Sequence, residues 1–140
     1  MRYLGLDLGT KTLGVAISDA TKTIATSLET IRFSELDYDS AIEKLKVLLK
    51  DFNVEKIVLG FPKNMNNTVG ESGKRTLTFK EKLETSFHIP VIMQDERLST
   101  VEATNYMLEA NASRKMRKVK VDSVAANIIL QTYLDKEKGR

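Results

Sequence analysis

The sequence contains no cysteine and a single histidine, His88. The lack of cysteine excludes a disulfide scaffold, a zinc–thiolate site, an iron–sulfur cluster and a thiol nucleophile. One histidine cannot supply a multi-histidine metal site, and a Ser-His-Asp triad would have to use His88. No apolar run approaches the roughly 18 residues that a membrane-spanning helix needs, and the N-terminus lacks a signal-peptide pattern. We therefore expect a cytoplasmic protein with no membrane partner.

Internal repeats, low-complexity stretches and linkers rich in proline, glycine or serine are also missing from the sequence. The 140 residues, 41% of them hydrophobic, suit one domain that covers residues 1–140. The net charge of +3 suggests an acidic partner without demanding one. Composition therefore leaves a small single domain with carboxylate chemistry as its chief catalytic option.

Hydrophobic periodicity predicts an α/β fold. Three extended stretches joined by short polar turns open the chain, at about 3–8, 13–18 and 23–32, which is typical of an antiparallel meander. Helices and strands then alternate. The pattern predicts a helix over 38–52, a strand buried on both faces at 57–59, a loop over 61–73, a helix over 71–87 and a strand at 90–94. A capping box at 99–102 opens a helix that extends to 108, and a polar basic stretch at 111–120 precedes a final helix over 121–132. Strand–helix–strand units require parallel, right-handed crossovers. We expect a mixed sheet with helices on its faces.

Three acidic positions stand out from this pattern. Asp7 interrupts the first strand, where a buried carboxylate is costly unless it is paired, bound to a metal or hydrogen-bonded to the following turn. Asp95 and Glu96 follow the 90–94 strand, at the sheet edge where open α/β sheets bind ligands, and as neighbours only one of them is expected to face a site. Asp122 falls in the first turn of the final helix, where the helix dipole alone would favour it.

Carboxylates from a strand, a strand end and a helix start suit Mg²⁺ or Mn²⁺, which prefer oxygen ligands and need neither histidine nor cysteine. Two such ions can activate a water molecule and stabilise the leaving oxygen in phosphodiester cleavage. A run of basic residues just before Asp122 would neutralise phosphates, or else form an ordinary solvated loop. The run contains Arg114, Lys115, Arg117, Lys118 and Lys120, and the residues that would extend it from the 61–73 loop are Lys63, Lys74 and Arg75.

The turn that follows the first strand admits a second interpretation. An aspartate followed by Gly9-Thr10 in a β-turn-β unit resembles the phosphate-binding turn of actin-like ATPases and sugar kinases, because backbone N–H groups of such a turn can hold a phosphate. Those proteins clamp their nucleotide between duplicated lobes, and this chain has neither the length nor the repeat. The turn is also too short to be a G-x-x-x-x-G-K-[ST] loop.

Four motifs together resemble the YqgF (RuvX-type) nuclease-like proteins of bacteria, members of the RNase H-like superfamily. The motifs occur in the order of that family, span nearly the whole chain and are specific in combination. They are Gly5-Leu6-Asp7-Leu8-Gly9-Thr10-Lys11 with Gly14-Val15-Ala16; Gly60-Phe61-Pro62 with Asn64-Met65; Asp95-Glu96-Arg97-Leu98-Ser99-Thr100 with Glu102-Ala103; and Val121-Asp122-Ser123 with Ala125-Ala126 and Leu130-Gln131.

The resemblance implies an RNase H-like fold with a five-stranded mixed sheet, and a site in which Asp7, Glu96 and Asp122 bind Mg²⁺ or Mn²⁺, with two ions during catalysis. Family members are linked to maturation of the 5′ end of 16S rRNA and were earlier labelled Holliday-junction resolvases. In the related RuvC-type resolvases the second acid ends the fourth strand, where this chain has Gly60. The resolvase label therefore transfers poorly.

These observations lead to the hypothesis of a metal-dependent endonuclease that acts on structured RNA, with precursor 16S rRNA as the favoured substrate. Lys11, Arg97 and the basic run 114–120 would bind phosphates of the substrate. One alternative is a resolvase of four-way DNA junctions, which would need a symmetric dimer. Another is a non-catalytic module that binds nucleic acid or the ribosome, and a small ATP-binding protein is the third.

Overall fold

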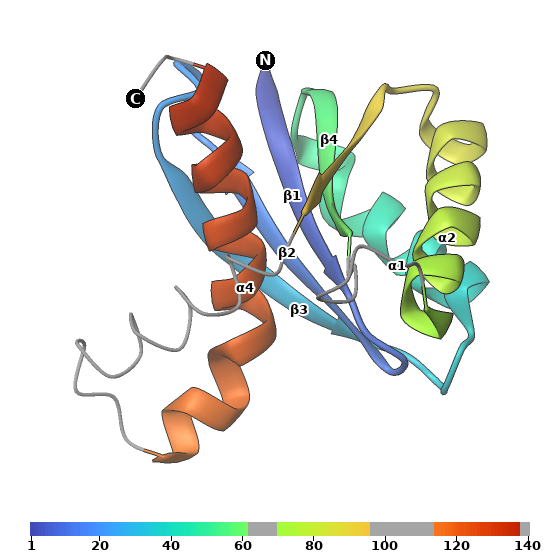
Figure 1. Ribbon diagram of the computed structural model, residues 1–140. Coiled ribbons are helices and arrows are strands. Elements are labelled where there is room, and N and C mark those ends of the chain that lie inside the picture. Colours follow the sequence, from blue (N-terminus) through green and yellow to red (C-terminus); the bar gives the residue numbers. More distant parts are fainter. Residues whose placement is uncertain (62–69, 96–113, 138–140) are drawn as a thin grey trace.

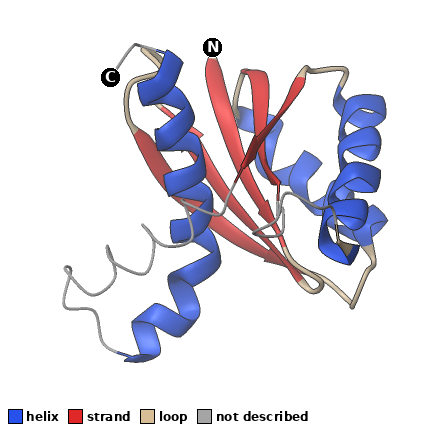
Figure 2. Cartoon of the chain, viewed as in Figure 1, coloured by secondary structure: helices blue, strands red, loops and turns tan. Residues whose placement is uncertain are grey.

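The computed structural model describes residues 1–61, 70–95 and 114–137 of the chain. Five strands form one mixed sheet in the order β3-β2-β1-β4-β5 (Figures 1 and 2). Strands β1 (Arg2–Leu8), β2 (Thr12–Ser18) and β3 (Ala25–Arg32) pair in antiparallel fashion. Strand β4 (Val54–Phe61) pairs with β1 in parallel, and β5 (Val91–Asp95) pairs with β4 in parallel. The predicted meander and the predicted parallel strands are both confirmed.

Short turns connect the strands of the meander. The turn between β1 and β2 is closed by Gly9, whose backbone N–H donates to the carbonyl of Thr12 at 2.8 Å. Between β2 and β3, the Asp19 carboxylate accepts hydrogen bonds from the backbone N–H groups of Thr23 and Ile24, at 2.8 and 3.2 Å. This turn absorbs residues 23 and 24, so β3 begins two residues later than the sequence pattern predicts.

The helices in the middle of the chain agree with their predicted ranges. Helix α1 (Tyr38–Leu48) starts at the cap Asp37, whose carboxylate accepts from the N–H of Ser40, and it continues into a 3₁₀ turn at Leu49–Asp51. Helix α2 (Glu71–Phe87) ends at His88, which adopts the left-handed conformation with φ of 55°. Of the predicted loop over 61–73, Phe61 closes β4 and residues 71–73 begin α2, while 62–69 lie outside the described residues. The predicted 99–108 helix is also outside them.

The last helix, α4 (Arg114–Glu137), begins earlier than predicted. Residues 114–120 are helical because arginine, lysine and methionine are strong helix formers and the stretch contains no glycine or proline. The prediction that Asp122 occupies the first turn was therefore wrong: Asp122 lies eight residues after Arg114, beyond the reach of the helix dipole. The prediction of a polar loop for the basic run was wrong for the same reason.

Helices cover the two faces of the sheet unequally. Among the described residues, helices α1 and α2 lie on one face and α4 lies on the other (Figure 1). Leu4 and Leu6 of β1 join the core on the α1/α2 face, together with Phe79 of α2. Tyr3, the neighbour of Leu4 on the opposite side of the strand, belongs to a smaller core on the α4 face. No helix among the described residues is long and apolar enough to cross a membrane.

Candidate functional site

Asp7 lies on the face of the sheet that α4 covers. Side chains alternate along a strand, and the even-numbered residues Leu4 and Leu6 of β1 point into the α1/α2 core. Tyr3 points into the α4 core, so Asp7 shares its face. The Asp7 side chain is half-buried near the carboxyl end of β1, where Asp7 pairs with Gly14 of β2. The carboxylate therefore stands at one edge of the sheet, on the side of α4.

Two contacts show how α4 runs relative to β1. Near the start of β1, the Tyr3 hydroxyl donates a hydrogen bond to the Glu137 carboxylate at 2.8 Å. Further along, a Cβ atom at Gly5 would lie 2.6 Å from the Cβ of Leu130 and 2.9 Å from the carbonyl oxygen of Ala126. Only glycine permits this approach of helix to strand. Helix α4 therefore runs antiparallel to β1, with its later residues opposite the start of the strand.

The same geometry locates position 122 on the helix. Asp7 lies two residues beyond Gly5, which is about 6.6 Å along a strand. Asp122 lies four residues before Ala126, which is about 6 Å along an α-helix. Because strand and helix run antiparallel, both steps lead in the same direction. The backbone of α4 at Asp122 therefore comes to the same end of β1 as Asp7.

Beside Asp7, the sheet carries little side-chain bulk on the α4 face. Leu6 pairs with Leu59 of β4, so the β4 residue next to Asp7 in the register is Gly60. Gly60 pairs in turn with Gln94, just before β5 ends. The candidate site thus extends from Asp7 of β1, past Gly60 of β4, which has no side chain, to the carboxyl end of β5.

The predicted site residues are described to different degrees. Asp7 is described in full, and Asp122 only as a position on the backbone of α4. Glu96, Lys63 and Arg97 lie outside the described residues. Among the described residues there is no group of three or more histidine, aspartate or glutamate side chains that could hold a metal ion.

Two of the predicted phosphate-binding side chains can be located. Lys11 is exposed in the turn between β1 and β2, and its backbone carbonyl accepts from the N–H of Phe33 at 3.0 Å. Arg75 lies on α2, across the sheet from α4. Burial raises the pKa of the Tyr38 hydroxyl, and the nearby charge of Arg75 opposes that rise. The basic residues of 114–118 are placed only by the backbone of α4, as Arg114, Lys115, Arg117 and Lys118.

Residues 1–136 match the RuvX family, described as Holliday junction resolvase. A protein of Bacillus subtilis (strain 168) with the name "Putative pre-16S rRNA nuclease" is 51% identical over 135 residues, which make up 96% of this chain and 98% of that protein. The chain belongs to the RuvX family. The family resemblance stated from the four sequence motifs is thereby confirmed.

Solved structures show that this RuvX-family chain has the fold of RuvC-like resolvases. The chain matches "T. thermophilus RuvC in complex with Holliday junction substrate" with a TM-score of 0.59 and 15% identity, covering 99% of this chain and 96% of the other. It matches the fowlpox virus resolvase in complex with Holliday junction DNA with a TM-score of 0.61 and 12% identity, covering 98% and 99%. At these identities the likeness concerns the fold alone, and it confirms the predicted RNase H-like class.

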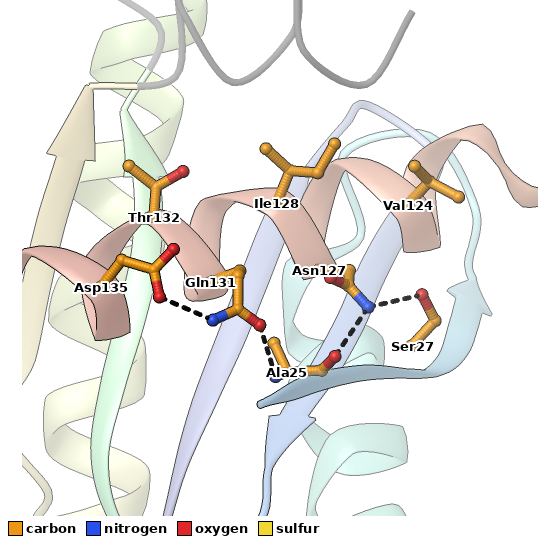
Figure 3. A pocket seen from close by; sticks show the side chains of 8 residues that line it. All are labelled: Ala25, Ser27, Val124, Asn127, Ile128, Gln131, Thr132 and Asp135. Carbon is orange, nitrogen blue, oxygen red and sulfur yellow. Dashed lines mark hydrogen bonds between the residues drawn. The ribbon is translucent and has the colours of Figure 1, made fainter. Parts of the chain in front are cut away.

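The sequence patterns missed the polar contacts between α4 and the edge strand β3. Gln131 accepts a hydrogen bond from the backbone N–H of Ala25 at 2.9 Å and donates to the carbonyl of Thr23 at 2.9 Å. Asn127 donates to the carbonyl of Ala25 at 3.1 Å (Figure 3). The two amides lie one helical turn apart on α4, and the sequence alone does not distinguish them from solvent-exposed side chains.

These amides line a cavity of about 360 Å³ between β3 and α4 (Figure 3). Val124, Ile128 and Thr132 of α4 also line it. Asp7 is not among the described residues that line this cavity. The cavity is therefore distinct from the edge of the sheet at which Asp7 lies.

Proposed function

We propose that this chain is a divalent-metal-dependent endonuclease that hydrolyses phosphodiester bonds in structured RNA, with the 5′ end of precursor 16S rRNA as its favoured substrate. Membership of the RuvX family and the name of the Bacillus subtilis relative support this proposal. The reaction would take place in the cytoplasm during ribosome biogenesis, and residues 1–140 would act as one domain.

In the proposed site, Asp7, Glu96 and Asp122 bind Mg²⁺ or Mn²⁺. The observation that carries the proposal is the contact of Gly5 with Ala126 and Leu130, because it aligns α4 with β1 so that positions 7 and 122 come to one end of the strand. Hard divalent cations prefer carboxylate oxygens, and three acids from a strand, a strand end and a helix match that preference. The donor set therefore fits the metal that the family implies.

Of the neighbouring acids Asp95, which ends β5, and Glu96, alternation favours Glu96. Val91 and Met93 of β5 pack in the α1/α2 core, so residues of even number on this strand belong to the α4 face. Gln94 is such a residue and pairs with Gly60. The period of two in the sequence therefore favours Glu96 over its neighbour Asp95 as the acid that acts together with Asp7. Glu96 is therefore the acid that we propose as the ligand.

The charges of the bound ions and of the basic side chains determine the role that we propose for each. Bound divalent ions would lower the pKa of a water molecule and stabilise the leaving oxygen. Lys11 would hold a phosphate beside Asp7, because it is exposed on the turn that follows β1. The cations of 114–118 on α4, and Lys63, Arg75 and Arg97, would bind phosphates further along the substrate. Their attraction would weaken as the salt concentration rises.

The proposal is tested by cleavage of a precursor 16S rRNA fragment in Mg²⁺ or Mn²⁺. Asp7→Asn keeps the size of the side chain and removes its charge, so we expect cleavage to fall by at least about 100-fold. The matched control is Asp39→Asn, because Asp39 is an exposed residue of α1 that pairs with Lys82 on the opposite face of the sheet. Full activity of Asp7→Asn would show that the proposed site is wrong.

A four-way DNA junction is the second candidate substrate, because the solved structures with the same fold include RuvC bound to a Holliday junction. The same assay distinguishes the two candidates when junction DNA and rRNA are offered at equal concentration. Cleavage of the junction with symmetric incisions would favour the resolvase, which also requires a dimer. Binding of either nucleic acid that persists in Asp7→Asn without metal would instead indicate a non-catalytic binding module.

A further inference from the structure

Apolar contacts hold α4 against the sheet. The core on the α4 face combines the alanines Ala16, Ala25 and Ala126 with larger side chains such as Leu130 and Leu134. Hydrophobic attraction is non-directional, so it holds the helix against the sheet without selecting one position along its axis. The close approach of α4 to Gly5 aligns the helix with β1 at one place, and directional contacts elsewhere would reinforce that alignment.

Directional contacts of that kind join α4 to the edge strand. Asn127 donates to the carbonyl of Ala25, and Gln131 accepts from the N–H of the same residue, at 3.1 and 2.9 Å. Both bonds therefore reach the outward edge of a single β3 residue from two successive turns of the helix (Figure 3). Sliding α4 by one turn, about 5.4 Å, would break both bonds at once.

The alignment extends from β3 to β1 through the sheet itself. Ala25 pairs with Ser18 of β2, and β2 pairs with β1 in the register Asp7 with Gly14. Because β3, β2 and β1 are hydrogen-bonded to one another, a helix that is bonded to Ala25 also has a defined position relative to Asp7. Asp122 lies five residues before Asn127 on the same helix.

We propose that Asn127 and Gln131 are positioning residues, which align α4 on the edge strand and thereby hold Asp122 opposite Asp7 for binding of the divalent metal. This inference rests on the proposed function for its catalytic meaning. The alignment of α4 itself does not depend on any metal. The two parts are therefore tested by separate measurements on the same variants.

The first measurement follows the alignment in the metal-free protein. We expect nuclear Overhauser contacts between the Hα protons of Gly5 and the side chain of Leu130 in the wild type, because these groups touch. The double variant Asn127→Ala/Gln131→Leu should lose or weaken these contacts while it stays folded. Thr132→Val is the matched control on the same helix and cavity, and it should keep them. Unchanged contacts in the double variant would overturn the proposal.

The second measurement is a Mn²⁺ titration, followed by the broadening of backbone amide signals near Asp7 and Ala126. In the wild type, both groups of signals should broaden at the same Mn²⁺ concentration. The double variant should need about tenfold more Mn²⁺ for the signals of α4, as is usual when a supporting residue of a metal site is removed. Leu45→Ala, a destabilised control on the α1/α2 face, should keep the wild-type midpoint.

The two measurements separate the possible failures. If Mn²⁺ broadens no signal near Asp7 in the wild type, the proposed metal site is wrong, and the contacts of Gly5 still decide the alignment. If the double variant binds Mn²⁺ like the wild type, the amides do not position Asp122. A restored midpoint in Asn127→Ala alone, with Gln131 intact, would assign the larger part of the alignment to Gln131.

Discussion

The two faces of the sheet are built on different principles. The α1/α2 face contains large, fully buried side chains such as Leu4, Leu6, Phe79 and Leu83. The α4 face contains several alanines and a glycine, which let the helix backbone approach the strand closely. Aromatic and polar contacts surround this smaller core. The first face thus offers most of the buried apolar area, and the second offers close and directional contact.

The two faces therefore have different roles: the α1/α2 face mainly stabilises the fold, and the α4 face mainly determines the alignment of α4 with the sheet. Interlocking apolar side chains stabilise the fold in proportion to the area that they bury, and a small rearrangement among them costs little function. On the α4 face, a shift of a few tenths of an ångström changes the position of a helix that we propose to carry a metal ligand. We therefore expect substitutions on the two faces to rank in opposite orders for stability and for activity.

The largest loss of stability should come from Phe79→Ala on the α1/α2 face. Phe79 is fully buried, so its truncation should lower the free energy of unfolding by about 3–5 kcal/mol. Urea denaturation measures this loss, and at low temperature the folded fraction should retain its Mn²⁺ midpoint. Loss of metal binding in the folded fraction would break the distinction between the faces.

An intermediate loss is expected for Gly5→Ala on the α4 face. The added Cβ would lie 2.6 Å from Leu130 Cβ and 2.9 Å from a backbone carbonyl, so α4 has to move. Overpacking of this kind costs about 1–3 kcal/mol. Leu4→Ala, on the other face of the same strand, should lose more stability than Gly5→Ala. The cleavage activity of Gly5→Ala should nevertheless fall more than that of Leu4→Ala. Equal activity of the two variants at equal folded fraction would contradict the comparison.

The smallest effect concerns Glu137 at the far end of α4. The hydrogen bond from the Tyr3 hydroxyl lowers the pKa of Glu137 below its usual value of 4.5, and Lys56 adds to this effect. The carboxylate therefore stabilises the fold above pH 4.5, and this stabilisation disappears as the pH falls through the lowered pKa. Since the side chain is 39% exposed, the contribution stays below about 1 kcal/mol.

Comparison of the wild type with Glu137→Gln measures that contribution. The difference in the free energy of unfolding should be largest above pH 4.5 and should disappear as the pH falls through the lowered pKa of Glu137. The α1/α2 variant Phe79→Ala provides the contrast, because its loss should not depend on pH in this range. A pH-independent difference for Glu137→Gln would mean that its charge does not hold α4.

Much of the fold was predictable because its signals are local. The period of two in β1 and β2 and the apolar run before Gly60 predict strands, and the range of α2 follows from the spacing of its apolar residues. The starts of β3 and α4 were not predicted correctly. In the first case Asp19 draws residues 23 and 24 into a turn, and in the second the helix propensity of a basic run outweighs its polarity.

The candidate site was predictable in residue type but not in geometry. Asp7 is conspicuous because a carboxylate is unusual inside an apolar strand. The alignment of Asp122 with Asp7 depends on the missing side chain of Gly5, and a sequence alone does not reveal which helix passes over that glycine. Gln131 and Asn127 look like solvent-exposed positions in the sequence, since their partners are backbone groups of β3, about a hundred residues away.

The order of the elements along the chain also determines when the proposed site can form during synthesis. Asp7 belongs to the first strand, whereas Asp122 lies on α4, which follows all five strands. A nascent chain that has completed β5 contains every strand of the sheet but lacks the helix that carries Asp122. Such an intermediate holds only part of the proposed metal site, so that cleavage would begin only after α4 has emerged and folded onto β1.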